Sequence, residues 1–390
     1  MKSLEITVEP KVLIWARKSI GKSVDDIAQK LKIDKTIINQ WEIGQRSVRL
    51  SQLEKLANIY KRPLAAFFLP EPPKEIPLPK DYRTLPLENR RVFSSKTLLA
   101  IRRAERIRRI AVELAESMER KIFTEVVKAS IDDAPEILAL KVREHLGISV
   151  DMQSKWRDER IALSEWRKIV ESKDVIVLYA SMPIEDTRGF SLSEKIYPVI
   201  VVNSQDSYTA RIFSLFHEYA HLMINNSGIC DMADRFYLSD EDKRIERFCN
   251  YFAGAFLVPK QDLINHRLLK TLKSDRDISD DYLKELAGDF KVSQEVILRR
   301  LVIIGRSSEK LYLKKREEWE ARAKEQRKLK RSGRKIPSRA CVQENGVLFV
   351  SLVLNSYGAE KITLRDISDY LGIRLKHLPK VEQLIAEKVL

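Results

Sequence analysis

Two histidines and a glutamate within one short run are the residues of this 390-residue sequence best suited to metal chemistry. They are His217, Glu218 and His221, in the apolar run FSLFHEYAHLM. Residues four apart share one face of an α-helix, so both imidazoles can reach one ion about 2 Å away. Glu218 then lies beside that ion, where its carboxylate can take a proton from water. With only five histidines in the sequence, composition alone would produce this pattern in under roughly one such chain in a hundred. The alternative is that these are two ordinary histidines on a buried helix, with no role as metal ligands.

A metal site of this kind needs a third protein ligand and keeps its fourth position open for water. Another helix with a strongly apolar face is expected downstream, and Glu246 is its acidic residue best placed to turn toward the histidines. An ion pair with Arg211 or Arg247 is the alternative role for this glutamate. Cys249 and Cys230 are rival ligands, although a set of two histidines and a cysteine is less usual for hydrolytic zinc. Zinc is the expected metal, and Mn or Fe suits the same ligand types.

If the metal activates water for attack on a carbonyl, the site also requires a donor for the developing oxyanion. Tyr237 and His266 are the candidates, with a structural role as the alternative for each, because such residues near a core are more often structural. The apolar run 199–203 is expected to offer its edge to an extended peptide substrate.

The elements that must position these residues are mostly helical. Helical periodicity extends from 207 to 304, and one long helix is expected over 94–123. Two runs rich in β-branched residues, 175–180 and 197–203, predict a small sheet. The expected fold class is therefore α+β and mainly α-helical, with one domain built around the small sheet.

The first 70 residues predict a small all-helical module. Ser23 is expected to cap a helix over 24–31, with Asp26 as its capping-box partner. Asp34 is then expected to cap a second helix that ends near Trp41. Two short helices joined by a tight turn form a helix-turn-helix, whose second helix can enter the major groove of DNA.

Three runs of this module carry a family resemblance: VDDIA at 24–28, WEIG at 41–44 and LEKLA at 53–57. Together they resemble the XRE family of Cro and phage-repressor type DNA-binding domains, over about residues 8 to 68. The resemblance implies double-stranded operator DNA as a partner, and a homodimer is compatible with it. The alternative is an XRE-like domain that dimerises or binds protein.

The same resemblance assigns the residues that contact DNA. Lys35, Thr36 and Gln40 occupy positions that reach base edges, and Arg46 approaches phosphate. Gln40 can make a bidentate contact with adenine, and Lys35 can donate to guanine.

A second resemblance covers the metal residues. HEYAH at 217–221, ERFCNYFA at 246–253 and Pro259 are similar to the ImmA/IrrE metallopeptidase family, whose pattern is HExxH, then ExxxNxFA, then Leu or Val before Pro. RGFS at 188–191 and PVIVVN at 198–203 resemble the strand pair that precedes these motifs in that family.

This resemblance implies a zinc-bound, gluzincin-like site. His217, His221 and Glu246 are the implied ligands, and Glu218 is the implied general base. The implied substrate is another protein.

The charge of the chain is concentrated in two segments. Lys and Arg number 71 against 56 Asp and Glu, a net charge of +15. Residues 1–70 carry 13 basic and seven acidic side chains, and residues 306–339 carry 14 and five, which together account for the whole excess. The first segment fits a DNA reader. The second predicts a helix that contacts phosphate, with a solvated helix face as the alternative.

Composition and prolines complete the expected organisation. The chain is expected to begin with a helix-turn-helix domain at 1–70, a proline-rich linker at 71–95 and a metallopeptidase domain at 96–305. A basic helix and small helical C-terminal domain follow at 306–390.

No apolar run approaches the roughly 20 residues of a membrane span, and three cysteines without a CxxC pair argue against a disulfide framework. A cytoplasmic protein without membrane contact is expected.

Two functions from different classes follow from these patterns. In the first, the chain is a DNA-binding transcriptional regulator whose zinc endopeptidase cleaves a regulatory protein, a repressor or an antitoxin. In the second, it is a non-proteolytic XRE-family regulator or antitoxin whose metal site is structural or sensory. Glu218 favours the first function, because a structural zinc site has no need of a general base.

Overall fold

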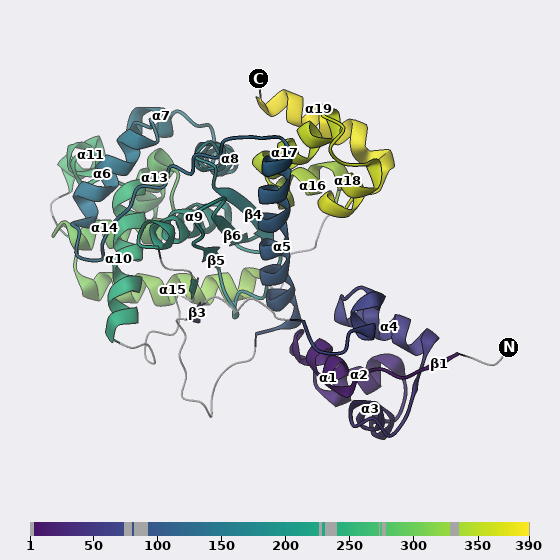
Figure 1. The fold of residues 1–390 in the computed structure, drawn as a ribbon. Helices are drawn as coiled ribbons and strands as arrows, with labels where there is room; N and C mark the ends of the chain where they lie inside the picture. Colours follow the sequence, from purple (N-terminus) through teal and green to yellow (C-terminus); the bar gives the residue numbers. More distant parts are fainter. Residues whose placement is uncertain are drawn as a thin grey trace. The chain divides into compact units, whose positions relative to one another are not determined.

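The computed structural model of the chain divides into two compact units, 1–78 with 87–103, and 79–86 with 104–390. The structure describes residues 4–73, 80–81, 93–225, 228–230, 240–272, 274, 278–327 and 335–389 (Figure 1). Helix α5 (Ser95–Ser117) contributes residues to both units. The fold is α+β and mainly helical, as the sequence predicts.

The first unit is a bundle of short helices closed by a small strand pair. Its elements are β1 (Glu5–Ile6), α1 (Pro10–Lys18), α2 (Val24–Leu31), α3 (Lys35–Glu42), β2 (Val48–Arg49), α4 (Leu50–Tyr60) and the 3₁₀ turn η1 (Leu64–Phe68). Strands β1 and β2 pair antiparallel, an addition to the all-helical module that the sequence predicts. Two-residue strands carry too little periodicity to be recognised from sequence.

The capping residues expected for the helix-turn-helix are those observed. Ser23 accepts a hydrogen bond from the Asp26 backbone, and Asp26 accepts one from the Ser23 backbone, both at 3.0 Å. Asp34 accepts from the backbone of Thr36 at 2.8 Å and so caps α3. Lys32 between the helices is left-handed, with φ of 56°. These local bonds satisfy orphan backbone N–H groups and set where α2 and α3 begin.

The second unit is built on a five-stranded mixed sheet. Its strands, β3 (Lys80–Asp81), β4 (Ile176–Ala180), β5 (Gly189–Leu192), β6 (Val199–Asn203) and β7 (Gly228–Cys230), lie in the order β3-β7-β5-β6-β4. β4 and β6 are parallel, β5 is antiparallel to β6 and β7, and β3 is parallel to β7.

Three sequence expectations about strands need correction. Lys80 and Asp81 form β3 inside the segment expected to be a linker, and β7 interrupts the stretch expected to be helical. Both short strands are defined by pairing with distant partners, which local patterns do not encode. The run 199–203 has no free edge for a peptide, because β6 pairs with β5 on one side and with β4 on the other.

Helices surround this sheet (Figure 1). They are α6 (Pro135–His145), α7 (Val150–Ser154), α8 (Glu159–Glu171), α9 (Tyr208–Met223), α10 (Asp240–Leu257), α11 (Lys260–Asn265), α12 (Arg267–Thr271), α13 (Asp280–Phe290), α14 (Gln294–Ile303), α15 (Glu309–Arg327), α16 (Pro337–Asn345), α17 (Val347–Gly358), α18 (Leu364–Leu371), the 3₁₀ turn η5 (Leu375–His377) and α19 (Leu378–Val389). Among the described residues, none of these helices has both the length and the apolar character to cross a membrane.

Aromatic side chains fill the core between α8, α9 and α10. Phe216 of α9 stacks on Phe256 of α10 with ring centroids 4.1 Å apart, and Trp166 of α8 meets Phe216 edge-on at 4.8 Å. These rings are fully buried. Large aromatic side chains dominate core energetics, so this cluster fixes α9 and α10 side by side.

The basic segment around α15 is partly neutralised within the unit. Lys315 and Arg322 both bind Asp280 of α13, at 2.6 and 3.0 Å. The apolar side chains of Leu311 and Trp319 pack against the core. Part of the charge of this helix therefore serves to hold α15 on the domain.

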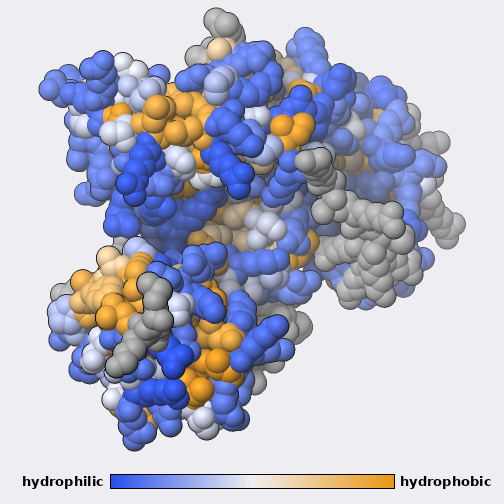
Figure 2. Space-filling view, turned by 90° about the vertical axis from the view of Figure 1, so that its right-hand side faces the viewer, coloured by the Kyte–Doolittle hydropathy of each residue, from blue (hydrophilic) through white to orange (hydrophobic). Residues whose placement is uncertain are grey.

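The visible face of the molecule is mainly hydrophilic, with separate apolar patches (Figure 2). In the first unit, the large apolar side chains that are exposed include Leu4, Ile43 and Phe68. Single apolar residues at a surface are ordinary in folded proteins.

Candidate metal centre and DNA-reading helix

Helix α9 carries the HExxH residues into the interior of the second unit. Ser207 caps the helix by accepting from the Ala210 backbone at 3.2 Å. The side chains around the motif are apolar, and they bury this helix so completely that His217 is 2% exposed, Glu218 1% and His221 0%. Buried polar side chains must find partners, so three such residues on one buried helix indicate a built polar site.

Glu246 of α10 faces both histidines of α9. The Nε2 atoms of His217 and His221 lie 3.3 Å apart, and carboxylate oxygens of Glu246 lie 3.5 and 3.3 Å from them, respectively. The ligand atoms of the three residues all lie within 4.8 Å of one another. The structure thus brings together, from two helices, the residues expected to hold the metal.

This donor set fits zinc. In a tetrahedral site with N and O ligands about 2.0–2.1 Å from the ion, ligand atoms lie roughly 3.3–3.4 Å apart. The separations of 3.3, 3.3 and 3.5 Å match that spacing. Two imidazoles and a carboxylate are also the ligand types that catalytic zinc sites use.

Asn250 orients the first histidine. Its Oδ1 lies 3.1 Å from Nδ1 of His217, so Nδ1 carries the proton and donates to the amide. The lone pair of His217 is then on Nε2, which faces His221 and Glu246. Asn250 follows Glu246 by one turn of α10, and its place in the quoted motif is the only sign of it at the level of sequence. The four-residue spacing was the available signal.

The Glu218 carboxylate lies against strand β5 where the chain has a glycine. A Cβ atom at Gly189 would come within 3.2 Å of Glu218 Oε1 and 2.9 Å of the Val201 carbonyl oxygen. Any larger residue would therefore displace the glutamate or the neighbouring strand. Local sequence patterns do not indicate this role of Gly189, because the contact joins two distant segments.

Of the rival ligands, Cys249 lies next to the cluster and interacts with His221. Cys249 is fully buried, and this burial raises the pKa of its thiol, which favours the neutral form over the thiolate that binds metal. The side chain of Cys230 lies outside the described residues. Arg211 donates to the backbone carbonyls of Ser204 and Asp206.

Of the two oxyanion candidates, the structure describes only His266. Tyr237 lies outside the described residues. His266 accepts at Nδ1 from the Leu268 backbone at 3.3 Å, and its Nε2 lies 3.1 Å from Asp289. Both ring nitrogens of His266 thus have local partners, and it caps α12.

In the first unit, the residues expected to read DNA lie on or just after α3. Lys35, Thr36 and Arg46 are exposed, and Gln40 is half-buried. The Thr36 hydroxyl donates to Asp34 at 2.8 Å, so this side chain also serves the helix cap. Lys35 is free to move toward a ligand, because its ammonium is 3.5 Å from a carboxylate that is itself exposed.

A buried ion pair holds α3 on the bundle. Arg17 of α1 donates to both carboxylate oxygens of Glu42 at 2.6 and 2.7 Å, and this pairing raises the pKa of Arg17. A bidentate pair fixes the relative orientation of two groups. Glu42 lies at the end of α3 and therefore anchors the exposed face of that helix.

Comparison with known protein families agrees with this geometry. Residues 13–67 match the family described as Helix-turn-helix, and residues 170–302 match Peptidase M78, described as the IrrE N-terminal-like domain. The second match extends from the end of α8 through α14 and contains the whole metal cluster. A search of curated proteins gives no match to the chain.

The class is therefore that of a helix-turn-helix DNA-binding domain joined to a domain of a peptidase family. More specifically, the chain combines a helix-turn-helix of the XRE type with a domain of the IrrE/ImmA type.

Proposed function

We propose that the protein is a DNA-binding transcriptional regulator whose second domain is a zinc endopeptidase. Its substrate is another regulatory protein, a repressor or an antitoxin. One observation carries the proposal. His217, His221 and Glu246 converge within 4.8 Å, and Glu218, a residue that a structural metal site does not need, is buried beside them.

The residues of the chain divide the work of hydrolysis. Zinc, when bound by His217, His221 and Glu246, supplies Lewis-acid chemistry toward a peptide carbonyl and water. The Glu218 carboxylate takes the proton of the attacking water and delivers it to the leaving amine. Asn250 keeps His217 in the tautomer whose Nε2 is a lone-pair donor.

The DNA-binding half supports a regulatory role. The four proposed contact residues are Lys35, Thr36, Gln40 and Arg46. They lie on or next to α3, the second helix of the motif, which is the one that enters the major groove in this class of domain. A regulator that binds an operator and removes a second regulator acts twice on the same set of genes.

The test replaces Glu218 by Gln, which keeps the volume and removes the proton acceptor. Zinc content of the purified full-length protein is measured together with the abundance of cellular repressors and antitoxins by quantitative proteomics. Glu241→Gln, at an exposed glutamate at the start of α10, is the matched control. One regulator is expected to disappear in cells with the wild-type or Glu241→Gln protein and to persist with Glu218→Gln.

The alternative function gives a different result. If Glu218→Gln retains zinc and the same regulator still disappears, Glu218 is not the general base and the peptidase proposal fails. If no regulator changes in wild type, while operator binding depends on zinc, the metal site is structural or sensory.

A further inference from the structure

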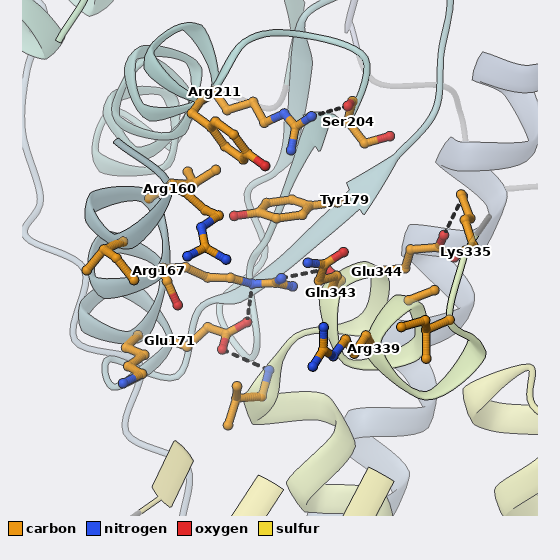
Figure 3. Close-up of a pocket in the computed structure, with 18 residues that line it drawn as sticks. Arg160, Arg167, Glu171, Tyr179, Ser204, Arg211, Lys335, Arg339, Gln343 and Glu344 are labelled. Carbon is orange, nitrogen blue, oxygen red and sulfur yellow. Dashed lines mark hydrogen bonds and ion pairs between the residues drawn. The ribbon is translucent and has the colours of Figure 1, made fainter. Parts of the chain in front are cut away.

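A cavity of about 640 Å³ lies in the second unit between α8, the end of β4, the start of α9, and α16 (Figure 3). Its lining is strongly basic. Six of the lining side chains are Arg or Lys, and two are Glu. The volume falls within the range of about 300–1,000 Å³ typical of small-molecule sites.

Three of the six basic groups are neutralised by carboxylates. Arg167 pairs with Glu171 at 3.0 Å, Lys335 with Glu344 at 3.0 Å, and Lys168 with Glu165 at 3.2 Å. These pairs account for both acidic residues of the lining. They leave the cavity with an excess of positive charge.

The other three basic groups are arginines from three different helices. Arg160 of α8, Arg211 of α9 and Arg339 of α16 form no ion pair within the described part of the chain, although Asp158 and Asp206 interact electrostatically with Arg160 and Arg211, respectively. Figure 3 shows them entering the cavity from separate sides. Arg211 is partly buried, which lowers the pKa of its guanidinium. Three like charges around one cavity repel each other, and a bound anion removes that repulsion.

Neutral groups add hydrogen-bonding and aromatic surface to this charge. The hydroxyls of Ser164 and Ser204 line the same cavity. Tyr208 is 45% exposed and lies beneath the Arg211 guanidinium at 5.3 Å. A guanidinium matches the oxygens of a phosphate group in a bidentate manner. An exposed aromatic ring offers a stacking surface to a planar group.

We infer that this cavity binds a small phosphorylated molecule of about nucleotide size. Arg160 and Arg339 bind its phosphate groups, and Arg211, which donates to the backbone carbonyls of Ser204 and Asp206, adds positive charge beside them. Neither the family matches nor the proposed peptidase function assigns a ligand here, and the inference does not depend on that function. The concave lining, drawn from four elements, suits a compact ligand better than the continuous backbone of a nucleic acid.

Such a ligand would bridge the sheet-containing core and the C-terminal helices. One side of the cavity is closed by a set of buried hydrogen bonds made by Arg167 and Glu171, here called the latch. Arg167 donates to the Gln343 carbonyl at the end of α16, and Glu171 accepts from the backbone N–H groups of Val347 and Leu348 at 3.0 and 3.3 Å. A ligand held by Arg160 and Arg339 would add a second connection between α8 and α16. Binding is therefore expected to raise the thermal stability of the protein.

The test measures binding of pyrophosphate and ATP to the full-length protein by isothermal titration calorimetry, with sodium sulfate at equal ionic strength as the background. Arg160→Ala and Arg339→Ala each remove one proposed phosphate contact. Arg365→Ala is the matched control, because Arg365 is an exposed arginine of α18 outside the lining. One ligand per chain is expected, with affinity about tenfold or more weaker in each cavity variant, since a hydrogen bond to a charged group contributes about 1.5–3 kcal/mol.

The other outcomes distinguish a nucleotide from a simple phosphate compound as the ligand, and some of them would contradict the inference. Tighter binding of ATP than of pyrophosphate identifies a nucleotide, and equal binding identifies the phosphate groups alone. Arg339→Lys keeps the charge and is expected to retain part of the affinity, which separates loss of a contact from misfolding. Three results would overturn the inference: no binding of either probe, equal affinity in all variants, or binding of a DNA duplex through Arg160 and Arg339 without binding of the small probes.

Discussion

Replacement of Gly346 by alanine is expected to release the C-terminal helices from the core. Gly346 lies at the junction of α16 and α17 with φ of +86°. A Cβ atom there would come within 2.2 Å of Glu171 Oε1, and 2.9 Å of both Arg167 Nη2 and the Val177 carbonyl oxygen. These atoms belong to the latch that closes one side of the basic cavity.

The expected cost has two parts. Gly346 has φ of +86° and ψ of +156°, a backbone region that essentially only glycine adopts, so an L-residue there costs about 1–3 kcal/mol. The clash also displaces a buried, hydrogen-bonded ion pair, and breaking such a pair costs about 3–5 kcal/mol. Because the carboxylate can move by part of that distance before its bonds are lost, we expect a total of about 3 kcal/mol or more. This corresponds to roughly a hundredfold change in an opening equilibrium.

Amide hydrogen exchange measured by mass spectrometry reports this opening directly. Peptides that cover 347–358 include the N–H groups bound by Glu171, and we expect them to exchange about a hundredfold faster in Gly346→Ala. Two control variants separate the parts of the cost. Gly372→Ala also has a positive φ, of +64°, although in the left-handed helical region, and no atom lies within 4 Å of the added Cβ, whereas Gly288→Ala has neither penalty. The first should accelerate exchange about tenfold around α18, and the second should leave α13 unchanged or more protected.

Exchange that Gly346→Ala accelerates no more than Gly372→Ala does would contradict this expectation. That result would mean that the latch tolerates the added methyl group. Uniform acceleration across the whole second unit would show global destabilisation, and the latch would then not act as a local connection.

Three further variants test the other sites. Asn250→Ala is expected to weaken zinc binding about 10- to 100-fold, because the variant loses the residue that orients a metal ligand. Competition with a zinc chelator measures the affinity, and an unchanged affinity would contradict this role of Asn250. Gln40→Ala should relax the preference at one base pair by about 1–3 kcal/mol, and equal binding of wild type and variant across a panel of operator sequences would count against a base contact. Lys315 and Arg322 lower the pKa of Asp280, so the stability from this carboxylate is present above its unfolded pKa of about 3.9 and is lost as pH falls through the lower folded value. The melting temperature of the wild type should therefore exceed that of Asp280→Asn at pH 7, and the difference should become smaller below about pH 4. A difference that does not change with pH would argue against the ion pairs.

The elements that local chemistry determines were predictable from the sequence. The caps at Ser23 and Asp34 each involve residues no more than three positions apart, so their signal is contiguous. The helix that carries His217 and His221 is likewise a local feature, since the spacing of four and the apolar neighbours are both visible in one run. The prediction of Glu246 as the third ligand depended on a second helix and on the family resemblance.

The features that the sequence did not reveal depend on contacts between distant segments. β3 and β7 are too short to show a period, and their pairing joins residues about 150 positions apart. The glycine at 189 matters only because the Glu218 side chain lies over it. The basic cavity draws its lining from residues 160 to 347, and only folding shows which of its arginines form no ion pair within the described part of the chain.

Helix α9 connects the two proposed sites physically. Arg211 near its start lines the basic cavity, and His217 follows six residues later, about 9 Å along the helix axis. The helix dipole favours an anion near its first turn and a cation near its last, where His221 lies. The anion inferred for the cavity and the cation inferred for the cluster are therefore both favoured by the same helix, and each also attracts the other. The Glu218→Gln and Arg160→Ala variants separate the two sites, because Glu218 does not line the cavity and Arg160 is not a metal ligand.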